Sequence, residues 1–282
     1  MPLITAEGVY PNTSNEDYHA SPGLSNSKMG LLLPPSCPAN FKYNESQPHE
    51  DTDAFSLGSA VHTMCFEPDE FSKRFYTVVE VPKRTSNLGK ASHEQMLLKA
   101  GNRLIIDKKD SEIVKGMTSN VVNHAVWRKL MAKVKDEGDK PCIEYSLAWI
   151  DPDSGVLLRS RPDFFTQNII IDLKTTKDSS PLAFSKAVVD YAYHRQGALT
   201  CDGLKHLTGR HYDQVVLFVV DKNPPHPVRC YVLKQSALDQ GRYEYKYAAG
   251  VYAECVKTQT WHGYPEVIED LDIPAWAYRS FE

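Results

Sequence analysis

The sequence has no paired cysteines and no long apolar run. Its six cysteines stand singly at positions 37, 65, 142, 201, 230 and 255, so it contains no CxxC pair. This spacing argues against an iron–sulfur cluster or a cysteine-ligated zinc site, and it indicates reduced core thiols. No window holds the roughly 18 apolar residues of a membrane span, and the start does not resemble a secretion signal. We therefore expect a cytoplasmic protein without membrane contact.

The chain also lacks the excess of basic residues that is common in nucleic-acid binders. Lys and Arg number 32 against 36 Asp and Glu, which gives a net charge of −4. This balance disfavours an extended electrostatic grip on DNA. It leaves room for a nuclease, because acids that hold metal ions offset basic groups elsewhere. Contact with DNA would then come from a local patch, or from a channel assembled from several subunits.

The 282 residues, 41% of them hydrophobic, are enough for one large domain. We expect an N-terminal extension at 1–55, a core at 56–260 and a tail at 261–282. Hydrophobic periodicity predicts helices at 57–71, 91–106, 110–133, 181–208 and 236–258, and strands at 75–81, 142–150, 156–165, 168–175, 214–221 and 228–234. This order predicts an α/β or α+β fold in which helices flank a mixed central sheet.

The segment from Arg161 to Lys174 carries the clearest chemistry. On a strand, Asp172 and Lys174 point to the same face while Leu173 points into the core. A turn at 166–168 would bring Asp163, near the end of the preceding strand, beside Asp172. A lone DxK is usually a surface pair, but here it follows three consecutive isoleucines, which indicate a buried strand.

Two neighbouring carboxylates repel each other, at a cost of roughly 4 kcal/mol at about 4 Å and an effective dielectric near 20. A divalent cation offsets that cost, and oxygen ligands suit Mg²⁺ or Mn²⁺. One or two such ions support phosphodiester hydrolysis by generating hydroxide and by stabilising the leaving oxygen. Lys174 would hold or activate the water, or bind the scissile phosphate.

Several further residues are candidates for the same site. Glu144 lies on the preceding strand. Its side chain could lie near a metal ion or face solvent, and the sequence does not favour either placement. Arg159 and Arg161 share a face with Asp163. They could bind phosphate through forked hydrogen bonds or lie on a solvated strand face, and the sequence does not favour either role. Lys83 and Arg84 flank a flexible basic loop and are weaker candidates for contact with the DNA backbone.

The ordered set of motifs resembles the PD-(D/E)XK nuclease signature, with Pro162-Asp163 followed by Asp172-Leu173-Lys174. The wider chain resembles the RecE-type exonuclease branch of that superfamily. The segments that carry the closer resemblance are 18–27 (YHASPGLSNS), 57–62 (LGSAVH), 193–196 (YHRQ) and 273–276 (IPAW).

The resemblance implies roles for individual residues. His62, Asp163, Asp172 and the carbonyl of Leu173 would be metal ligands, and Lys174 would be the catalytic lysine. Glu144 resembles the extra acid of the superfamily, which can sit near a second metal ion. Gln196 resembles the glutamine of a QxxxY motif and would orient the water or contact the phosphate. The tyrosine of that motif is replaced by Thr200, so Tyr193 is the alternative for DNA contact.

The function implied by the resemblance is a metal-dependent exonuclease that acts on double-stranded DNA ends in the 5′ to 3′ direction. It would leave 3′ single-stranded tails for an annealing protein of the RecT type, in phage or prophage recombination in a bacterial host. The assembly implied is a ring-shaped homo-oligomer, a tetramer or a trimer. Another RecB-like endonuclease or exonuclease, and a non-catalytic DNA-binding module, are the alternatives.

Overall fold

The computed structural model describes residues 3–47, 57–212, 214–274 and 277–278. Its helices are α1 (Asn15–Ala20), α2 (Asn26–Gly30), α3 (Pro38–Ser46), α4 (Leu57–Phe66), the 3₁₀ turn η1 (Pro68–Glu70), α5 (Phe71–Arg74), α6 (Asn87–Ala100), α7 (Lys108–Asn123), α8 (Ala125–Asp136), α9 (Pro181–Asp190), α10 (Tyr193–Thr208) and α11 (Gln235–Thr258). Its strands are β1 (Gly8–Tyr10), β2 (Phe75–Val78), β3 (Leu104–Asp107), β4 (Cys142–Ile143), β5 (Ser146–Ile150), β6 (Leu157–Ser160), β7 (Phe164–Phe165), β8 (Ile170–Thr176), β9 (Val215–Asp221) and β10 (Val228–Val232).

A mixed five-stranded sheet, in the order β10-β9-β8-β7-β4, forms the centre of the fold. Strands β8 and β9 run parallel, and the other neighbours are antiparallel. A second sheet, in the order β1-β5-β6, is wholly antiparallel, and β2 and β3 form a short parallel pair. The mixed central sheet confirms the fold class that the sequence predicts.

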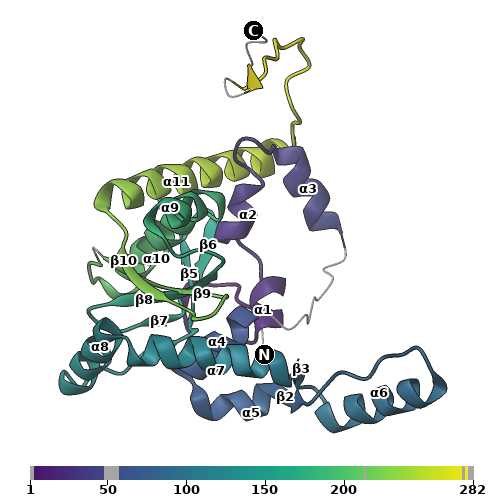
Figure 1. The fold of residues 1–282 in the computed structure, drawn as a ribbon. Coiled ribbons are helices and arrows are strands. Elements are labelled where there is room, and N and C mark those ends of the chain that lie inside the picture. Colours follow the sequence, from purple (N-terminus) through teal and green to yellow (C-terminus); the bar gives the residue numbers. More distant parts are fainter. Residues whose placement is uncertain (1–2, 48–56, 213, 275–276, 279–282) are drawn as a thin grey trace.

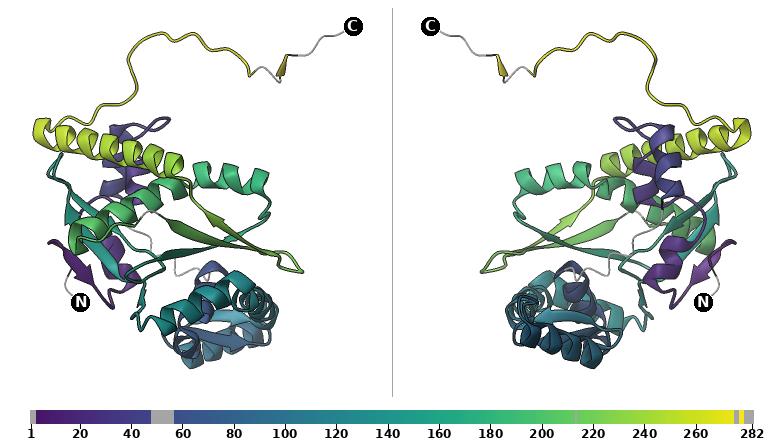
Figure 2. Two further views of the ribbon diagram at one scale, coloured as in Figure 1. Left: turned by 90° about the vertical axis from the view of Figure 1, so that its left-hand side faces the viewer. Right: turned by 90° about the vertical axis from the view of Figure 1, so that its right-hand side faces the viewer.

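Helices cover both faces of the central sheet (Figures 1 and 2). Alternate side chains of β8 and β9 supply the two hydrophobic cores, as expected for strands buried on both faces. Ile171 and Leu173 pack with residues of α4, α7 and α8 on one face. Ile170 and Leu217 pack with α10, α11 and the N-terminal helices on the other. The central strands are therefore rigidly held where β8 carries Asp172.

The predicted hairpin of 142–150 and 156–165 is present, but each of its arms is divided between two sheets. Strands β5 and β6 pair in the smaller sheet, whereas β4 and β7 pair in the central sheet. The first break falls at Glu144, whose backbone adopts the left-handed region with φ 52°. The second falls between Ser160 and Phe164 and contains Arg161 and Asp163. Both breaks thus carry candidate site residues.

The prediction of a helix at 91–106 is wrong at its C-terminal end. Helix α6 ends at Ala100, because Gly101 takes φ 60°, and 104–107 form strand β3 beside β2. The predicted helix at 110–133 is two helices, α7 and α8, separated by the extended residue His124. The loop with Lys83 and Arg84 leads into α6, and this arm projects from the body of the molecule (Figure 1).

The N-terminal extension lies against the smaller sheet, and the tail leaves the body after α11 (Figure 2). Leu24 bridges to Leu158 of β6 and is fully buried. In the tail, Trp261 stacks on Phe41, and of the 273–276 motif only Ile273 and Pro274 belong to the described residues. Among the residues that the structure describes, no helix is long and apolar enough to cross a bilayer.

Gly241 lets α11 lie against α10, and we expect Gly241→Ala to lower the free energy of unfolding by about 2–3 kcal/mol. A Cβ atom there would lie 2.4 Å from the carbonyl oxygen of His194, so the backbones would have to separate. Gly250 is the matched control on the same helix, since a Cβ atom meets nothing within 4 Å there. Gly250→Ala should be neutral, or stabilising by up to about 1 kcal/mol. Urea denaturation of both variants tests this, and equal midpoints would contradict it.

Candidate active site

Antiparallel pairing of β7 with β8 brings Asp163 and Asp172 together. Phe164 lies opposite Ile171, so the next pair along the ladder is Asp163 and Asp172. The carboxylate of Asp163 accepts a hydrogen bond from the backbone N–H of Leu173 at 2.7 Å. The predicted turn through 166–168 therefore joins the two strands as expected.

Lys174 lies between Asp172 and helix α10. Its Nζ is 2.6 Å from Oδ2 of Asp172 and 3.4 Å from Oε1 of Gln196, and the amide of Gln196 donates to Oδ1 of Asp172 at 3.4 Å. The ring of Tyr193, one helical turn before Gln196, has its centroid 4.6 Å from Nζ. Burial opposes the charge of Lys174, but Asp172 and Asp163 raise its pKa above the usual value. The lysine is therefore a cation here.

His62 reaches the same place from α4, on the opposite face of the sheet. Its Nε2 lies 2.5 Å from the carbonyl oxygen of Leu173, and its Nδ1 lies 3.4 Å from Oδ1 of Asp163. Ala60 and Val61 of the same helix are fully buried, which fixes α4 against the sheet. The histidine of the LGSAVH segment is thus placed beside one aspartate and beside the Leu173 carbonyl.

The carboxyl group of Asp163 is electrostatically crowded. Burial, followed by the nearby charge of Asp172, raises its pKa to about 7, although His62, Lys174 and the Leu173 N–H act in the opposite direction. An ionised Asp163 is therefore costly unless a further positive charge is present. Such a crowded carboxylate is typical of a site that binds a divalent cation.

The donor set fits Mg²⁺ or Mn²⁺, because it offers two carboxylates, a carbonyl oxygen and an imidazole. Within the described ranges, however, no three His, Cys, Asp or Glu side chains converge closely enough to hold an ion as they stand. The carboxylate of Asp172 pairs with Lys174, with Nζ 2.6 Å from Oδ2. Asp163 and the Leu173 carbonyl both lie beside His62.

Glu144 does not join the aspartates. Its carboxylate lies 3.6 Å from both Arg74 and Arg161, and Arg74 also pairs with Glu67 at 2.8 Å. Its backbone contacts the site, through an N–H that donates to the carbonyl of Asp163 at 3.0 Å. The expected role beside a second metal ion stays a prediction, and the ion pairs with Arg74 were not foreseen.

The sequence leaves phosphate contact and a solvated strand face equally open for Arg159 and Arg161, and in the structure both side chains contact the N-terminal extension. Arg159 is 1% exposed, donates to the carbonyl of Tyr18 and lies 4.8 Å from the centroid of that ring. Arg161 donates to the carbonyl oxygens of Thr13 and Glu144 at 2.7 and 2.9 Å. Both arginines hold the N-terminal extension to the sheet, so neither presents the open fork expected for phosphate. The sequence of a strand does not reveal which distant segment packs over its basic side chains.

The YHRQ segment at the start of α10 points in two directions. Tyr193 and Gln196 face the aspartates, whereas His194 and Arg195 pair with Glu244 of α11 at 3.0 and 3.3 Å. Thr200, at the tyrosine position of the QxxxY pattern, is buried, and its hydroxyl lies 2.6 Å from that of Ser160. The aromatic ring at this site therefore comes from Tyr193.

Lys83 and Arg84 lie in the arm between β2 and α6. Arg84 makes a hydrogen bond with the ring of His93 within the same arm. Among the described residues, no contact links Lys83 or Arg84 to the two aspartates. Their contact with DNA stays a prediction.

Comparison with known proteins identifies the family and the fold. Residues 28–272 match the family described as a PDDEXK-like domain of unknown function (DUF3799). The chain belongs to this family. A crystal structure of a candidate exonuclease from Eubacterium rectale has the same fold, with a TM-score of 0.55 and 14% identity over 93% of this chain and 96% of that one.

A much weaker likeness links this PDDEXK-like chain to an alkaline exonuclease from Laribacter hongkongensis. The TM-score is 0.25 and the identity 9%, over 68% of this chain and 97% of that one. No curated protein matches the sequence. The family match places Asp163, Asp172 and Lys174 in a nuclease-like PDDEXK domain.

Proposed function

We propose that this PDDEXK-like protein is a metal-dependent deoxyribonuclease that digests double-stranded DNA from its ends. The observation that carries the proposal is the meeting of Asp163, Asp172 and Lys174 at one point, flanked by His62 and Gln196. Crowded acids beside a buried lysine form an arrangement that is costly for the fold alone. In phosphodiester hydrolysis, the acids would bind the metal ion and the lysine would contact the phosphate.

Each side chain then has a chemical task. His62, Asp163, Asp172 and the Leu173 carbonyl would hold Mg²⁺ or Mn²⁺, and a bound ion would supply the nucleophilic hydroxide and stabilise charge on the phosphate. Lys174, kept protonated by its acidic neighbours, would donate to an oxygen of the scissile phosphate as Asp172 turns from it. Gln196, which already contacts both residues, would orient the water.

Linear duplex DNA labelled at either 5′ end, incubated with Mg²⁺, Mn²⁺ or EDTA, tests the activity directly. We expect release of nucleotides from linear duplex only with a divalent ion, and 3′ single-stranded tails as products. Covalently closed circles should stay intact. Cutting of circles would indicate an endonuclease instead of an exonuclease. DNA binding without cleavage in every condition would contradict the proposal and favour a non-catalytic DNA-binding protein.

We also propose that the protein acts as a ring of three or four copies and passes its 3′ tails to a RecT-type annealing protein in phage-type recombination. The resemblance of segments 18–27, 57–62 and 193–196 to RecE-type exonucleases supports this finer assignment. The net charge of −4 also suits a ring, since a few basic residues from each copy would converge on one duplex. Light scattering on the purified protein gives the subunit number, and a monomer that digests DNA at full rate would contradict the ring.

A further inference from the structure

A small hollow continues from the proposed catalytic residues into the N-terminal extension. It has a volume of about 270 Å³, and its lining includes Gln196, Arg159, His19, Ser25 and Ser27. Gln196 contacts both Asp172 and Lys174, so the hollow begins directly beside them. The YHASPGLSNS segment, which the catalytic chemistry does not use, thus forms one wall of a cavity next to it.

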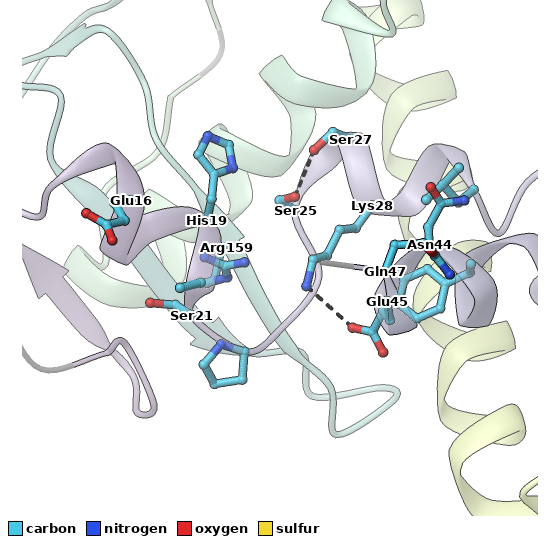
Figure 3. A pocket seen from close by; sticks show the side chains of 14 residues that line it. Glu16, His19, Ser21, Ser25, Ser27, Lys28, Asn44, Glu45, Gln47 and Arg159 are labelled. Carbon is cyan, nitrogen blue, oxygen red and sulfur yellow. Dashed lines mark hydrogen bonds and ion pairs between the residues drawn. The ribbon is translucent and has the colours of Figure 1, made fainter. Parts of the chain in front are cut away.

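A larger hollow of about 590 Å³ extends the first one. Figure 3 shows its lining, which includes His19, Ser25, Ser27 and Arg159. These four residues also line the smaller hollow. The two differ in charge, because Glu16 and Glu45 line the larger hollow and no carboxylate lines the smaller one within the described chain. The part nearest the catalytic residues is therefore the part suited to an anion.

Arg159 gives this smaller hollow an uncompensated positive charge. The side chain is buried, and within the described ranges it forms no ion pair, since its partners are the carbonyl oxygens of Tyr18 and Gly23. Its Nε has no hydrogen-bond partner in this part of the chain either. Burial correspondingly lowers the pKa of the guanidinium. A buried charge without a counter-ion is costly, and an anion in the adjoining hollow would reduce that cost.

Two hydroxyl groups that line the hollow have hydrogen-bonding capacity to spare among the described residues. The oxygens of Ser25 and Ser27 lie 3.1 Å apart, so one O–H donates to the other oxygen, and the second O–H has no acceptor among the described residues. Ser25 precedes α2 but makes no capping hydrogen bond with it. A phosphate oxygen is a suitable acceptor, since hydroxyl groups commonly bind the phosphates of DNA.

We infer that the smaller hollow binds a phosphate group of the substrate strand next to the scissile phosphodiester, held by Ser25 and Ser27 with the charge of Arg159 behind them. This inference rests on the proposed function and adds the path of the strand to it. The strand would pass from Lys174 and Gln196 over the YHASPGLSNS segment. The phosphate is either an internal one or the one at the end of the strand, and both have the same chemistry.

The test removes the negative charge from one phosphate at a time. A series of duplexes, each with a single uncharged methylphosphonate linkage at a successive position, is digested by the parent, by Ser25→Ala/Ser27→Ala and by Ser119→Ala. Ser119 is an exposed serine of α7 that lines neither hollow, which makes it the matched control. Duplexes with a 5′-phosphate or a 5′-hydroxyl end are compared in parallel.

We expect the parent to lose about tenfold to a hundredfold in kcat/KM at one position, as for a charge-assisted hydrogen bond. The double variant should show a similar loss on native DNA and no further loss at that position, whereas Ser119→Ala should match the parent. Sensitivity only to the 5′-terminal group would assign the hollow to the terminal phosphate. If the double variant cuts native DNA like the parent, or keeps the full sensitivity, the inference is wrong while the nuclease stands. A parent that cuts no DNA at all overturns the proposed function instead.

Discussion

Asp172→Asn should lower the rate of DNA digestion by a factor of about a thousand or more. Asparagine keeps the shape of the side chain and an oxygen that can accept from Lys174, now 2.6 Å away, but it removes the negative charge. The site then offers one carboxylate instead of two to a divalent ion. The measurement is the initial rate on linear duplex in saturating Mg²⁺ or Mn²⁺.

The fold should survive this change, because Asp172→Asn relieves the repulsion that Asp163 now experiences. Circular dichroism and thermal melting therefore accompany the rate measurement. Asp153→Asn is the control, since Asp153 is exposed and pairs with Lys246 on the surface. That variant should cut DNA like the parent. A folded Asp172→Asn protein with the parental rate would show that the catalytic site lies elsewhere.

The centre of the site was predictable because it depends on neighbouring segments of the chain. Strand alternation places Asp172 and Lys174 on one face, and a short turn between two strands places Asp163 opposite Asp172. The three isoleucines before Asp172 indicated a buried strand, and that strand is central. His62 was different, because only the resemblance of the LGSAVH segment pointed to it.

The parts that were not predicted depend on distant segments. The sequence predicts a helix up to residue 106, where strand β3 begins at Leu104, because the apolar residues there suit either state and the partner strand β2 belongs to an earlier segment. The ion pairs of Glu144 are another such case, because Arg74 comes from a segment about 70 residues earlier than its partner. Arg159 lies on a strand face whose cover, the N-terminal extension, carries no signal in the strand itself.

Asp163 should make the metal-free protein less stable as the pH rises from about 4 to 7, and Asp163→Asn should remove this contribution. Asp163 has a pKa of about 7 in the folded protein, against an ordinary value of 3.8. Between these values the folded protein keeps a proton that the unfolded chain has released, so the unfolding free energy decreases with pH. The full contribution of Asp163 is on the order of 4 kcal/mol.

Urea denaturation in EDTA at pH 5 and pH 8, on the parent and on Asp163→Asn, measures this effect. The difference between the two proteins is the informative quantity, since other carboxylates change stability with pH in both alike. Addition of Mn²⁺ at pH 8 should then stabilise the parent, by about 2.7 kcal/mol at a hundredfold excess over Kd, and should stabilise Asp163→Asn much less. If both proteins lose stability equally between pH 5 and pH 8 and respond equally to Mn²⁺, Asp163 neither carries the crowded charge nor binds the ion. Such a result would remove the electrostatic basis for a divalent-metal site between β7 and β8.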